Sequence, residues 1–360
     1  MSVTGVAPWQ LYQGNKVGYQ LIQGKRTVKR VAINGLGRVG RLLLRRYLQS
    51  DFQEFAIVAV NDPTPADNLI YLLKYDSVYG RADFGIRHEK NQLWLDDLVL
   101  PLFAETDPAR LPWDKLEIDI VMECSGHFTK RTDAIKHINA GAHRVVISAP
   151  SPDADITLVL GVNEKAFDPN RHFVISNASC TTNSLAPPLK VLDDQFGVEQ
   201  ALVTTIHAYT SSQSMVDQAA GKKIRGRAGA VNIIPTATGA DAATVLVLPQ
   251  LKDRLSALAL RVPIPDGALT DISVLLKAPV TVAQVNQAFR NASEHELQGI
   301  LAYSDEDLVS SDIIGNPHSA IIHGQSTRVV LDHFVKLQVW YDNEFAYACR
   351  CLDLLERLPL

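Results

Sequence analysis

The sequence predicts an α/β protein in two parts, a parallel sheet with alternating helices followed by an α+β part with a mixed sheet. In the first half, short β-branched runs alternate with stretches of helical periodicity, which is the pattern of βαβ units. In the second half, long strand-like runs keep one polar face, as in a sheet covered on one side. The 360 residues, 46% of them hydrophobic and 21% charged, are sufficient for about two globular domains.

The N-terminal elements follow one another as strand, glycine turn, helix and strand. Residues 29–34 (KRVAIN) and 54–61 (EFAIVAVN) form apolar strand patterns, and residues 37–48 between them have helical periodicity. The alternation continues with strands at 118–124, 144–148 and 172–176 and a helix at 132–140. We therefore predict a first domain over residues 30–179, preceded by an N-terminal extension, 1–29. For that extension, a flexible arm, an interface segment and a misassigned start all stay open.

The C-terminal elements are longer. Strands with one polar face are expected at 201–207, 258–262, 270–277 and 335–341, and helices at 181–195, 280–292 and 345–358. This texture predicts a second, α+β domain over residues 180–342. The C-terminal helix, 343–360, is expected to complete the first domain.

A glycine motif lies between the first strand and the first helix. Gly35, Gly37 and Gly40 form G-x-G-x-x-G, which permits a tight turn, close approach of a pyrophosphate and close packing of the helix. Asp62 ends the next strand, 22 residues after Gly40. A carboxylate there accepts hydrogen bonds from a ribose and repels a 2′-phosphate. The motif predicts a Rossmann-like domain that binds NAD in preference to NADP.

A cysteine and a histidine are the candidate catalytic residues. Cys180 lies in Ser-Cys-Thr-Thr-Asn, where a strand ends and a helix begins, so the helix N-terminus should stabilise its thiolate. Read alone, such a cysteine is more often a small buried hydrophobe, but these polar neighbours favour a nucleophile. His207 ends a strand among hydroxyl residues and is the candidate base, although the sequence pattern leaves its role undecided.

Composition excludes several classes of protein. The formal charge of −4 lacks the basic bias of a nucleic-acid binder, and no apolar run has the length of a membrane span. The four cysteines are too few and too unevenly placed for a disulfide framework, and we expect no metal site. A cytoplasmic location is expected.

Seven segments together resemble the glyceraldehyde-3-phosphate dehydrogenase family, from about residue 28 to the C-terminus. They are INGLGRVGR (33–41), VNDP (60–63), SNASCTTN (176–183), TTIHAYT (204–210), NIIPTATGA (232–240), RVP (261–263) and WYDNE (340–344). The resemblance implies that Cys180 attacks the aldehyde and that His207 takes the proton and stabilises the oxyanion. It also implies a Cys180 thioester, phosphorylating oxidation of glyceraldehyde 3-phosphate to 1,3-bisphosphoglycerate, and a homotetramer. The segment 210–229 resembles the family's interface loop.

The resemblance assigns the binding residues position by position. Those implied for NAD are Gly35, Gly37, Arg38, Val39, Gly40, Asp62, Ser125, Ser148 and Asn343. Those implied for the substrate's phosphate and for inorganic phosphate are Ser179, Thr181, Thr210, Arg225, Thr238, Gly239 and Arg261. Hydroxyls and arginines are the groups expected to bind a phosphate dianion.

Some positions depart from the family pattern and leave alternatives open. Ser184 replaces a second cysteine, Ser212 replaces an Asp or Thr, and Gln218-Ala219 replaces a Leu-Pro pair, which leaves mixed NADP use as a minor alternative. The stretch 316–329 resembles erythrose-4-phosphate dehydrogenase, which hydrolyses its thioester, whereas TTIHAYTSSQ and PTATGA favour the phosphorylating enzyme. An arsenate-detoxification variant would have the same site, and a silent binding protein on this fold would be expected to have lost part of it.

Overall fold

The computed structural model describes residues 21–22, 25–26 and 28–359. They form two compact units. The first holds the described residues up to Ile156, Phe167–Asn177 and the segment from Cys351, and the second holds Thr157–Ala166 and Ala178–Arg350. The domain limits predicted from the sequence stay a prediction. The predicted extension 1–29 lies outside the described residues except near its end, where β1 (Leu21–Ile22) pairs with β2 (Lys25–Arg26).

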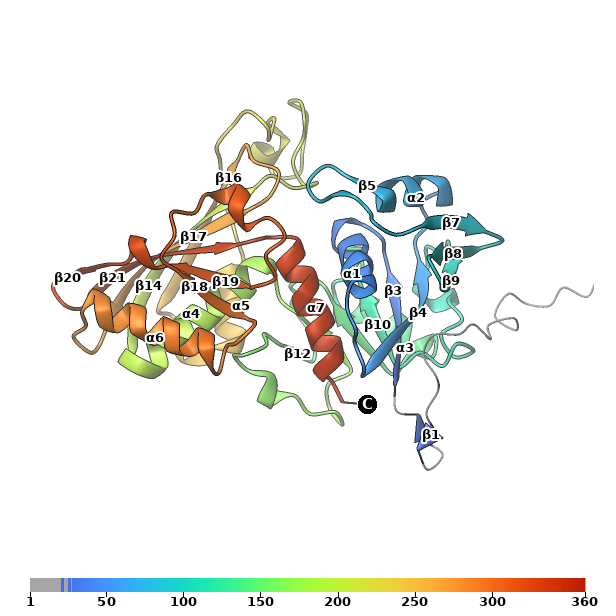
Figure 1. The fold of residues 1–360 in the computed structure, drawn as a ribbon, viewed down its shortest axis with the longest axis horizontal. Coiled ribbons are helices and arrows are strands. Elements are labelled where there is room, and N and C mark those ends of the chain that lie inside the picture. The colour runs from blue at the N-terminus through green and yellow to red at the C-terminus, as the bar shows by residue number, and fades with distance from the viewer. Residues whose placement is uncertain (1–20, 23–24, 27, 360) are drawn as a thin grey trace, which may run out of the picture. The chain divides into compact units, whose positions relative to one another are not determined.

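The first unit is built on a sheet of mostly parallel strands (Figure 1). In sheet order its nine described strands are β12 (Ile156–Thr157), β13 (Val174–Ser176), β11 (Arg144–Ile147), β10 (Ile120–Glu123), β3 (Lys29–Asn34), β4 (Phe55–Asn61), β9 (Leu98–Phe103), β8 (Gln92–Leu95) and β7 (Ile86–Glu89). The six strands from β9 to β13 are parallel and follow the order 3-2-1-4-5-6 of a doubly wound sheet. The order reverses between β3 and β10, so ligands are expected at the carboxyl ends of these two strands.

Three helices accompany this sheet: α1 (Arg38–Leu48), α2 (Ala66–Lys74) and α3 (Arg131–Asn139). Three consecutive leucines of α1 (Leu42, Leu43 and Leu44) are almost inaccessible to solvent. A short strand pair, β5 (Tyr75–Asp76) with β6 (Gly80–Arg81), follows α2. The core contains the fully buried Trp113, which is important for the site described below.

The second unit has a mixed sheet. In sheet order its described strands are β15 (Ile234–Ala237), β16 (Leu255–Val262), β14 (Val198–Ala208), β17 (Ala268–Leu276), β21 (Phe334–Tyr341), β19 (Ala320–His323) and β18 (Leu301–Ser304), and β20 (Arg328–Val330) pairs with β21. The pairs β14–β16 and β18–β19 are parallel, whereas the other pairs are antiparallel. Residues of β17 alternate between buried and partly exposed, as expected for a sheet with one covered face.

Helices α4 (Cys180–Phe196), α5 (Ala240–Val247) and α6 (Val282–Glu294) cover that face, and α7 (Phe345–Arg357) follows β21 (Figure 1). Their apolar side chains share one core with alternate residues of the sheet strands. Every strand and helix predicted from periodicity is present, with ends within three residues of the prediction. The elements that were not predicted are helices α2 and α5 and strands β1, β2, β5 to β9, β12, β15 and β18 to β20.

Candidate active site

The glycine turn after β3 is built for close approach of the backbone. Gly35 has φ +96°, and a Cβ there would lie 2.5 Å from the backbone nitrogen of Ser125. A Cβ at Gly40 would lie 2.0 Å from the carbonyl oxygen of Gly35, so α1 can pack on the turn only without a side chain. Gly37 is the N-cap of α1, where no side chain caps the helix and an added Cβ would meet nothing within 4 Å. This open, uncapped helix N-terminus fits the pyrophosphate of a dinucleotide.

Asp62 is held beside this turn. Its Oδ2 accepts a hydrogen bond from the Leu36 N–H at 2.6 Å, and its Oδ1 accepts one from the Thr64 N–H at 2.9 Å. A carboxylate has about four acceptor sites, so two bonds leave room for the hydroxyls of a ribose. The position of Asp62 therefore fits the role predicted for it.

The side chain of Arg38 is directed to another carboxylate. Its Nη1 donates to Asp76 Oδ2 at 2.5 Å, and its Nη2 donates to Oδ1 at 3.3 Å. Burial favours a higher pKa for Asp76, but Arg38 and the N–H groups of Tyr79 and Val78 outweigh it and lower the pKa. Contact of Arg38 with a pyrophosphate would therefore involve its backbone at the start of α1.

Two serines follow the neighbouring strands β10 and β11. Ser125 donates to Glu123 Oε1 from both its N–H, at 2.7 Å, and its hydroxyl, at 2.5 Å. The Ser148 N–H donates to the carbonyl oxygen of Glu123 at 2.9 Å. Both serines thus lie at the carboxyl edge of the parallel sheet, where the glycine turn also lies.

Cys180 is the first residue of α4. The preceding Ser179 is the N-cap, and its Oγ accepts a hydrogen bond from the Thr182 N–H at 3.0 Å. Ala178, one residue earlier, has φ +54°, a conformation that costs free energy for a residue with a Cβ and is found mainly where function requires it. The half-buried Cys180 sulfur lies 3.6 Å from Nε2 of His207.

His207 is positioned by the pairing of two strands. It lies near the end of β14, directly opposite Arg261 of the parallel strand β16. Nη1 of Arg261 lies 2.5 Å from Nδ1 of His207 and donates to the Ala208 carbonyl at 2.9 Å. Since a guanidinium only donates, this contact favours the tautomer with the proton on Nε2, which points a donor at the Cys180 sulfur. The other tautomer donates from Nδ1 to the Ala208 oxygen, 2.8 Å away, and leaves Nε2 as a base.

Burial has the largest effect on the pKa values of Cys180 and His207. It raises the pKa of Cys180 to about 11, although Arg261 and hydrogen bonds from Thr181 lower it. It lowers the pKa of His207 to about 3, and the charges of Arg261 and Arg225 lower it further. The chain alone therefore holds a neutral thiol beside a neutral imidazole at pH 7. The expectation of a stabilised thiolate does not hold for the chain alone, because burial outweighs Arg261 and the hydrogen bonds from Thr181.

A second polar group lies on the loop after β14. Thr210 Oγ1 lies 2.8 Å from Ser212 Oγ, which accepts from Nη1 of Arg225 at 3.3 Å. Nε of Arg225 donates to Thr236 Oγ1 at 3.2 Å. Predicted phosphate ligands Thr210 and Arg225 are thus joined through Ser212, a position already noted in the sequence.

The other predicted phosphate and cofactor residues lie at element ends in the second unit. Thr181 Oγ1 is 3.0 Å from the Tyr341 hydroxyl, whose pKa burial raises. Thr238 and Gly239 precede α5, and an added Cβ at Gly239 would meet open space. The buried Oδ1 of Asn343 has no hydrogen-bond partner in the described chain, so it is available to a donor from a ligand.

Among the described residues, no helix combines the length and apolarity needed to cross a bilayer. Within the same part of the chain, no group of three or more His, Cys, Asp or Glu side chains has a metal-binding arrangement.

Comparison with known proteins identifies the family. Residues 29–131 match the model of the NAD binding domain of glyceraldehyde 3-phosphate dehydrogenase, and residues 179–343 match that of its C-terminal domain. The chain belongs to the glyceraldehyde-3-phosphate dehydrogenase family. Among its relatives, glyceraldehyde-3-phosphate dehydrogenase 2 of Bacillus subtilis is 47% identical over 91% of this chain and 96% of the relative. Glyceraldehyde-3-phosphate dehydrogenase 2 of Streptomyces avermitilis is 49% identical over 90% and 97%, and the enzyme of Geobacillus stearothermophilus is 48% identical over 90% and 96%.

Membership of the glyceraldehyde-3-phosphate dehydrogenase family confirms four of the predictions. These are the family itself, the fold class, NAD as cofactor, and an NAD-dependent oxidoreductase that acts on an aldehyde. The roles of the individual site residues stay predictions.

Sequence reasoning missed two residues that hold neighbouring site residues in place. Glu123 was read only as part of a strand, although a carboxylate inside the apolar run IVMEC is a signal for a specific partner. Asp342, immediately before Asn343, accepts hydrogen bonds from the N–H groups of Glu344 and Phe345 and so caps the start of α7. An Asp followed by a helical stretch is a recognisable cap signal.

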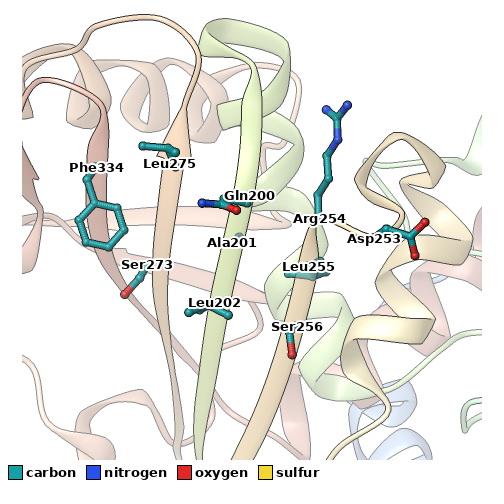
Figure 2. Close-up of a pocket in the computed structure, with 10 residues that line it drawn as sticks. All are labelled: Gln200, Ala201, Leu202, Asp253, Arg254, Leu255, Ser256, Ser273, Leu275 and Phe334. Carbon is teal, nitrogen blue, oxygen red and sulfur yellow. The ribbon is translucent and has the colours of Figure 1, made fainter.

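A hollow of about 330 Å³ lies on the outer face of the mixed sheet, and no predicted site residue lines it (Figure 2). Strands β14, β16, β17 and β21 and the turn before β16 contribute its lining: Gln200, Ala201, Leu202, Asp253, Arg254, Leu255, Ser256, Ser273, Leu275 and Phe334. Leu202 is 68% exposed there and Phe334 is 46% exposed. This face thus carries apolar side chains that the core does not cover.

Proposed function

We propose that the chain oxidises glyceraldehyde 3-phosphate to 1,3-bisphosphoglycerate with NAD and inorganic phosphate, through a thioester on Cys180. The observation that carries the proposal is the cluster of a thiol, an imidazole and a guanidinium at the start of α4, with Cys180 Sγ 3.6 Å from His207 Nε2 and Arg261 2.5 Å from His207 Nδ1. A nucleophile, a group that handles its proton and a cation for a phosphorylated substrate are the parts that this reaction needs.

Cys180 adds to the aldehyde carbon, forming the sulfur–carbon bond of a hemithioacetal. In the tautomer with the proton on Nδ1, Nε2 of His207 accepts the thiol proton, and Nε2–H then donates a hydrogen bond to the oxygen of the adduct. Bound NAD supplies the hydride acceptor. Loss of the hydride leaves a thioester on Cys180, and attack by phosphate on its carbonyl carbon breaks the sulfur–carbon bond and releases an acyl phosphate.

The two arginines link substrate binding to this proton transfer. Arg261 and Arg225 both lower the pKa of His207. A phosphate dianion bound by them offsets their charge and therefore raises the pKa of His207 when the substrate arrives. In the proposal Thr210 and Arg261 hold the substrate's phosphate. The ligands proposed for the attacking phosphate are Ser179, Thr181, Arg225, Thr238 and Gly239.

The proposed contacts with NAD are those that the sequence implied, residue by residue. The uncapped N-terminus of α1 holds the pyrophosphate at Arg38 and Val39, and Asp62 accepts hydrogen bonds from the adenosine ribose. Ser125 and Ser148 line the path of the cofactor. Asn343 accepts a hydrogen bond from the nicotinamide amide, a role supported by its unpartnered buried oxygen.

The proposed assembly is a homotetramer in the cytoplasm. The exposed apolar side chains of the outer sheet face, among them Leu202, Leu258 and Phe334, support burial against a second copy of this chain. The hollow in Figure 2 lies on the same face and could receive side chains from that copy. Sedimentation equilibrium of the wild-type chain and of Leu202→Asp measures the assembly, and a monomeric wild type would contradict it.

The decisive assay is NADH formation from glyceraldehyde 3-phosphate, with and without inorganic phosphate, beside erythrose 4-phosphate. The proposal expects turnover that depends on phosphate and prefers the three-carbon aldehyde. Phosphate-independent turnover with a preference for the four-carbon sugar would mean that the thioester is hydrolysed. The Cys180→Ala variant is the control, because any NADH that it forms does not pass through the thioester.

A further inference from the structure

A buried carboxylate lies beneath the glycine turn of the first unit. Glu123 is the last residue of β10, and its side chain is 1% exposed. In the parallel pairing it lies opposite Asn34, the last residue of β3. The order of the sheet reverses between these two strands, so Glu123 lies at the expected position of the ligand crevice.

Four hydrogen-bond donors converge on Glu123. Oε1 accepts from the N–H of Ser125 at 2.7 Å and from its hydroxyl at 2.5 Å. Oε2 accepts from Nδ2 of Asn34 at 2.5 Å and lies 3.1 Å from Nε2 of His137. The two oxygens of a carboxylate have about four acceptor sites, so these partners use them all.

The donor role of His137 is determined by a tryptophan. Nε1 of Trp113 lies 2.9 Å from Nδ1 of His137, and both side chains are 0% exposed. An indole N–H can only donate, so Nδ1 accepts and the imidazole proton is on Nε2, facing Glu123.

The donor role of Asn34 is determined in the same way by the backbone. Asn61 Oδ1 accepts from the N–H of Glu105 at 2.9 Å, which orients the Asn61 amide. Nδ2 of Asn61 then donates to Oδ1 of Asn34 at 2.7 Å. The Asn34 amide is left with its nitrogen toward Glu123, as the 2.5 Å contact requires.

This arrangement determines what the hydroxyl of Ser125 can offer to a ligand. Its proton is used in the bond to Glu123, and one acceptor site receives the N–H of His127 at 3.1 Å. The remaining capacity of this half-exposed oxygen is that of an acceptor. It therefore matches a donor such as a ribose hydroxyl and does not match the oxygens of a pyrophosphate.

We propose that Glu123 is a positioning residue of the dinucleotide site. It holds the Ser125 turn against the glycine turn, where a Cβ on Gly35 would lie 2.5 Å from the Ser125 nitrogen, and it keeps Ser125 Oγ an acceptor for a hydroxyl of NAD. His137 and Trp113 act through Glu123 by keeping the donor on Nε2. The inference rests on the proposed dinucleotide site and is independent of the aldehyde.

The test is the dissociation constant for NAD of the full-length chain, measured by calorimetric titration. Glu123→Gln places an amide where four donors converge, so one donor loses its acceptor, and we expect the dissociation constant to rise about tenfold. Asp119→Asn is the matched control. Asp119 is also buried and accepts a backbone N–H of β3, from Arg30 at 2.7 Å, but it lies before β10, at the opposite end of these strands. We expect a lower unfolding temperature for this control and a dissociation constant within about twofold of wild type.

Two further comparisons separate positioning from general support of the fold. In a Ser125→Ala background, Glu123→Gln is expected to weaken NAD binding by less than about threefold, because the hydroxyl that it orients is already absent. His137→Gln keeps an acceptor for Trp113 and a donor for Glu123 and should bind NAD nearly as wild type, whereas His137→Leu should bind several-fold more weakly. If Glu123→Gln does not fold, the comparison of His137→Gln with His137→Leu tests the proposal.

Three results would overturn the inference while wild type binds NAD. They are an unchanged dissociation constant in Glu123→Gln, an equal loss in Asp119→Asn, and an undiminished effect of Glu123→Gln in the Ser125→Ala background. A wild-type chain that binds no NAD would instead refute the dinucleotide site itself.

Discussion

Replacement of Arg261 by Gln removes the cation that most lowers the pKa of Cys180. The contacts of 3.6 Å from the sulfur to His207 and 2.5 Å from His207 to Arg261 put this charge about 8 Å from the sulfur. At an effective dielectric constant of about 20, a charge at that distance contributes about 2 kcal/mol, so the variant holds about thirtyfold less thiolate. A thiolate of higher pKa is also more nucleophilic, which raises the alkylation rate of each thiolate about fivefold. The net expectation is alkylation about sixfold slower.

The assay is the rate of alkylation of Cys180 by iodoacetamide, an uncharged reagent, between pH 6 and 9. Since the pKa of Cys180 is about 11, the rate should rise about tenfold per pH unit in both proteins, with the variant displaced to slower rates throughout. Arg225→Gln is the control, because Arg225 lowers the pKa of His207 but is not a cause of the Cys180 shift. Equal rates in wild type and Arg261→Gln, or equal slowing in both variants, would refute the electrostatic reasoning.

Three further variants test the rest of the site. Cys180→Ala should lower NADH formation at least about a thousandfold and leave the dissociation constant for NAD unchanged in a binding titration; turnover close to wild type would contradict the covalent mechanism. Asp62→Ala should raise the ratio of kcat/KM for NADP to that for NAD about tenfold or more, since the carboxylate no longer repels a 2′-phosphate, and an unaltered ratio would remove it as the discriminator. Asp76→Asn should lower the free energy of unfolding in urea by about 2 kcal/mol at pH 7, because it loses the bonds from Arg38. The lowered pKa of Asp76 means that this stability is present above the carboxyl's ordinary pKa and is lost as pH falls through the folded value, so a deficit that persists in strong acid would exclude this cause.

The elements predicted from the sequence are those with a continuous apolar run or a clear hydrophobic periodicity. The apolar run of β3 and the helical spacing of α1 each bury a continuous face, so the pattern and the structure agree. Helix α2 was missed because two of its large side chains, Tyr71 and Leu72, are exposed to solvent, Tyr71 at 62%. Strands β7 (IRHE) and β8 (QLWL) are only partly buried and lack the continuous apolar run that marks the equally short β10 and β11. Packing against their neighbours, which periodicity does not report, determines these elements.

In the candidate site, too, some residues could be predicted from the sequence and others could not. Cys180 could be predicted because its signal is local, a thiol in a polar turn at the start of a helix. His207 could not be decided from its neighbours, because its distance to Cys180 is created by the place of β14 in the sheet. Its contact with Arg261 depends on the register of two parallel strands, and the neutral state of the pair depends on burial. A short sequence motif predicts neither the register of two strands nor the burial of a side chain.

The parallel register of β14 and β16 has a consequence for the order in which parts of the site form during folding. Cys180 and His207 are 27 residues apart, on a helix and the strand that directly follows it. Arg261 is 54 residues from His207 and joins it only when the crossover through β15 and α5 has closed, the kind of non-local step that slows folding. Before that step the thiol lacks the influence of its arginine. Recovery of the native alkylation rate during refolding therefore reports the pairing of β16 with β14.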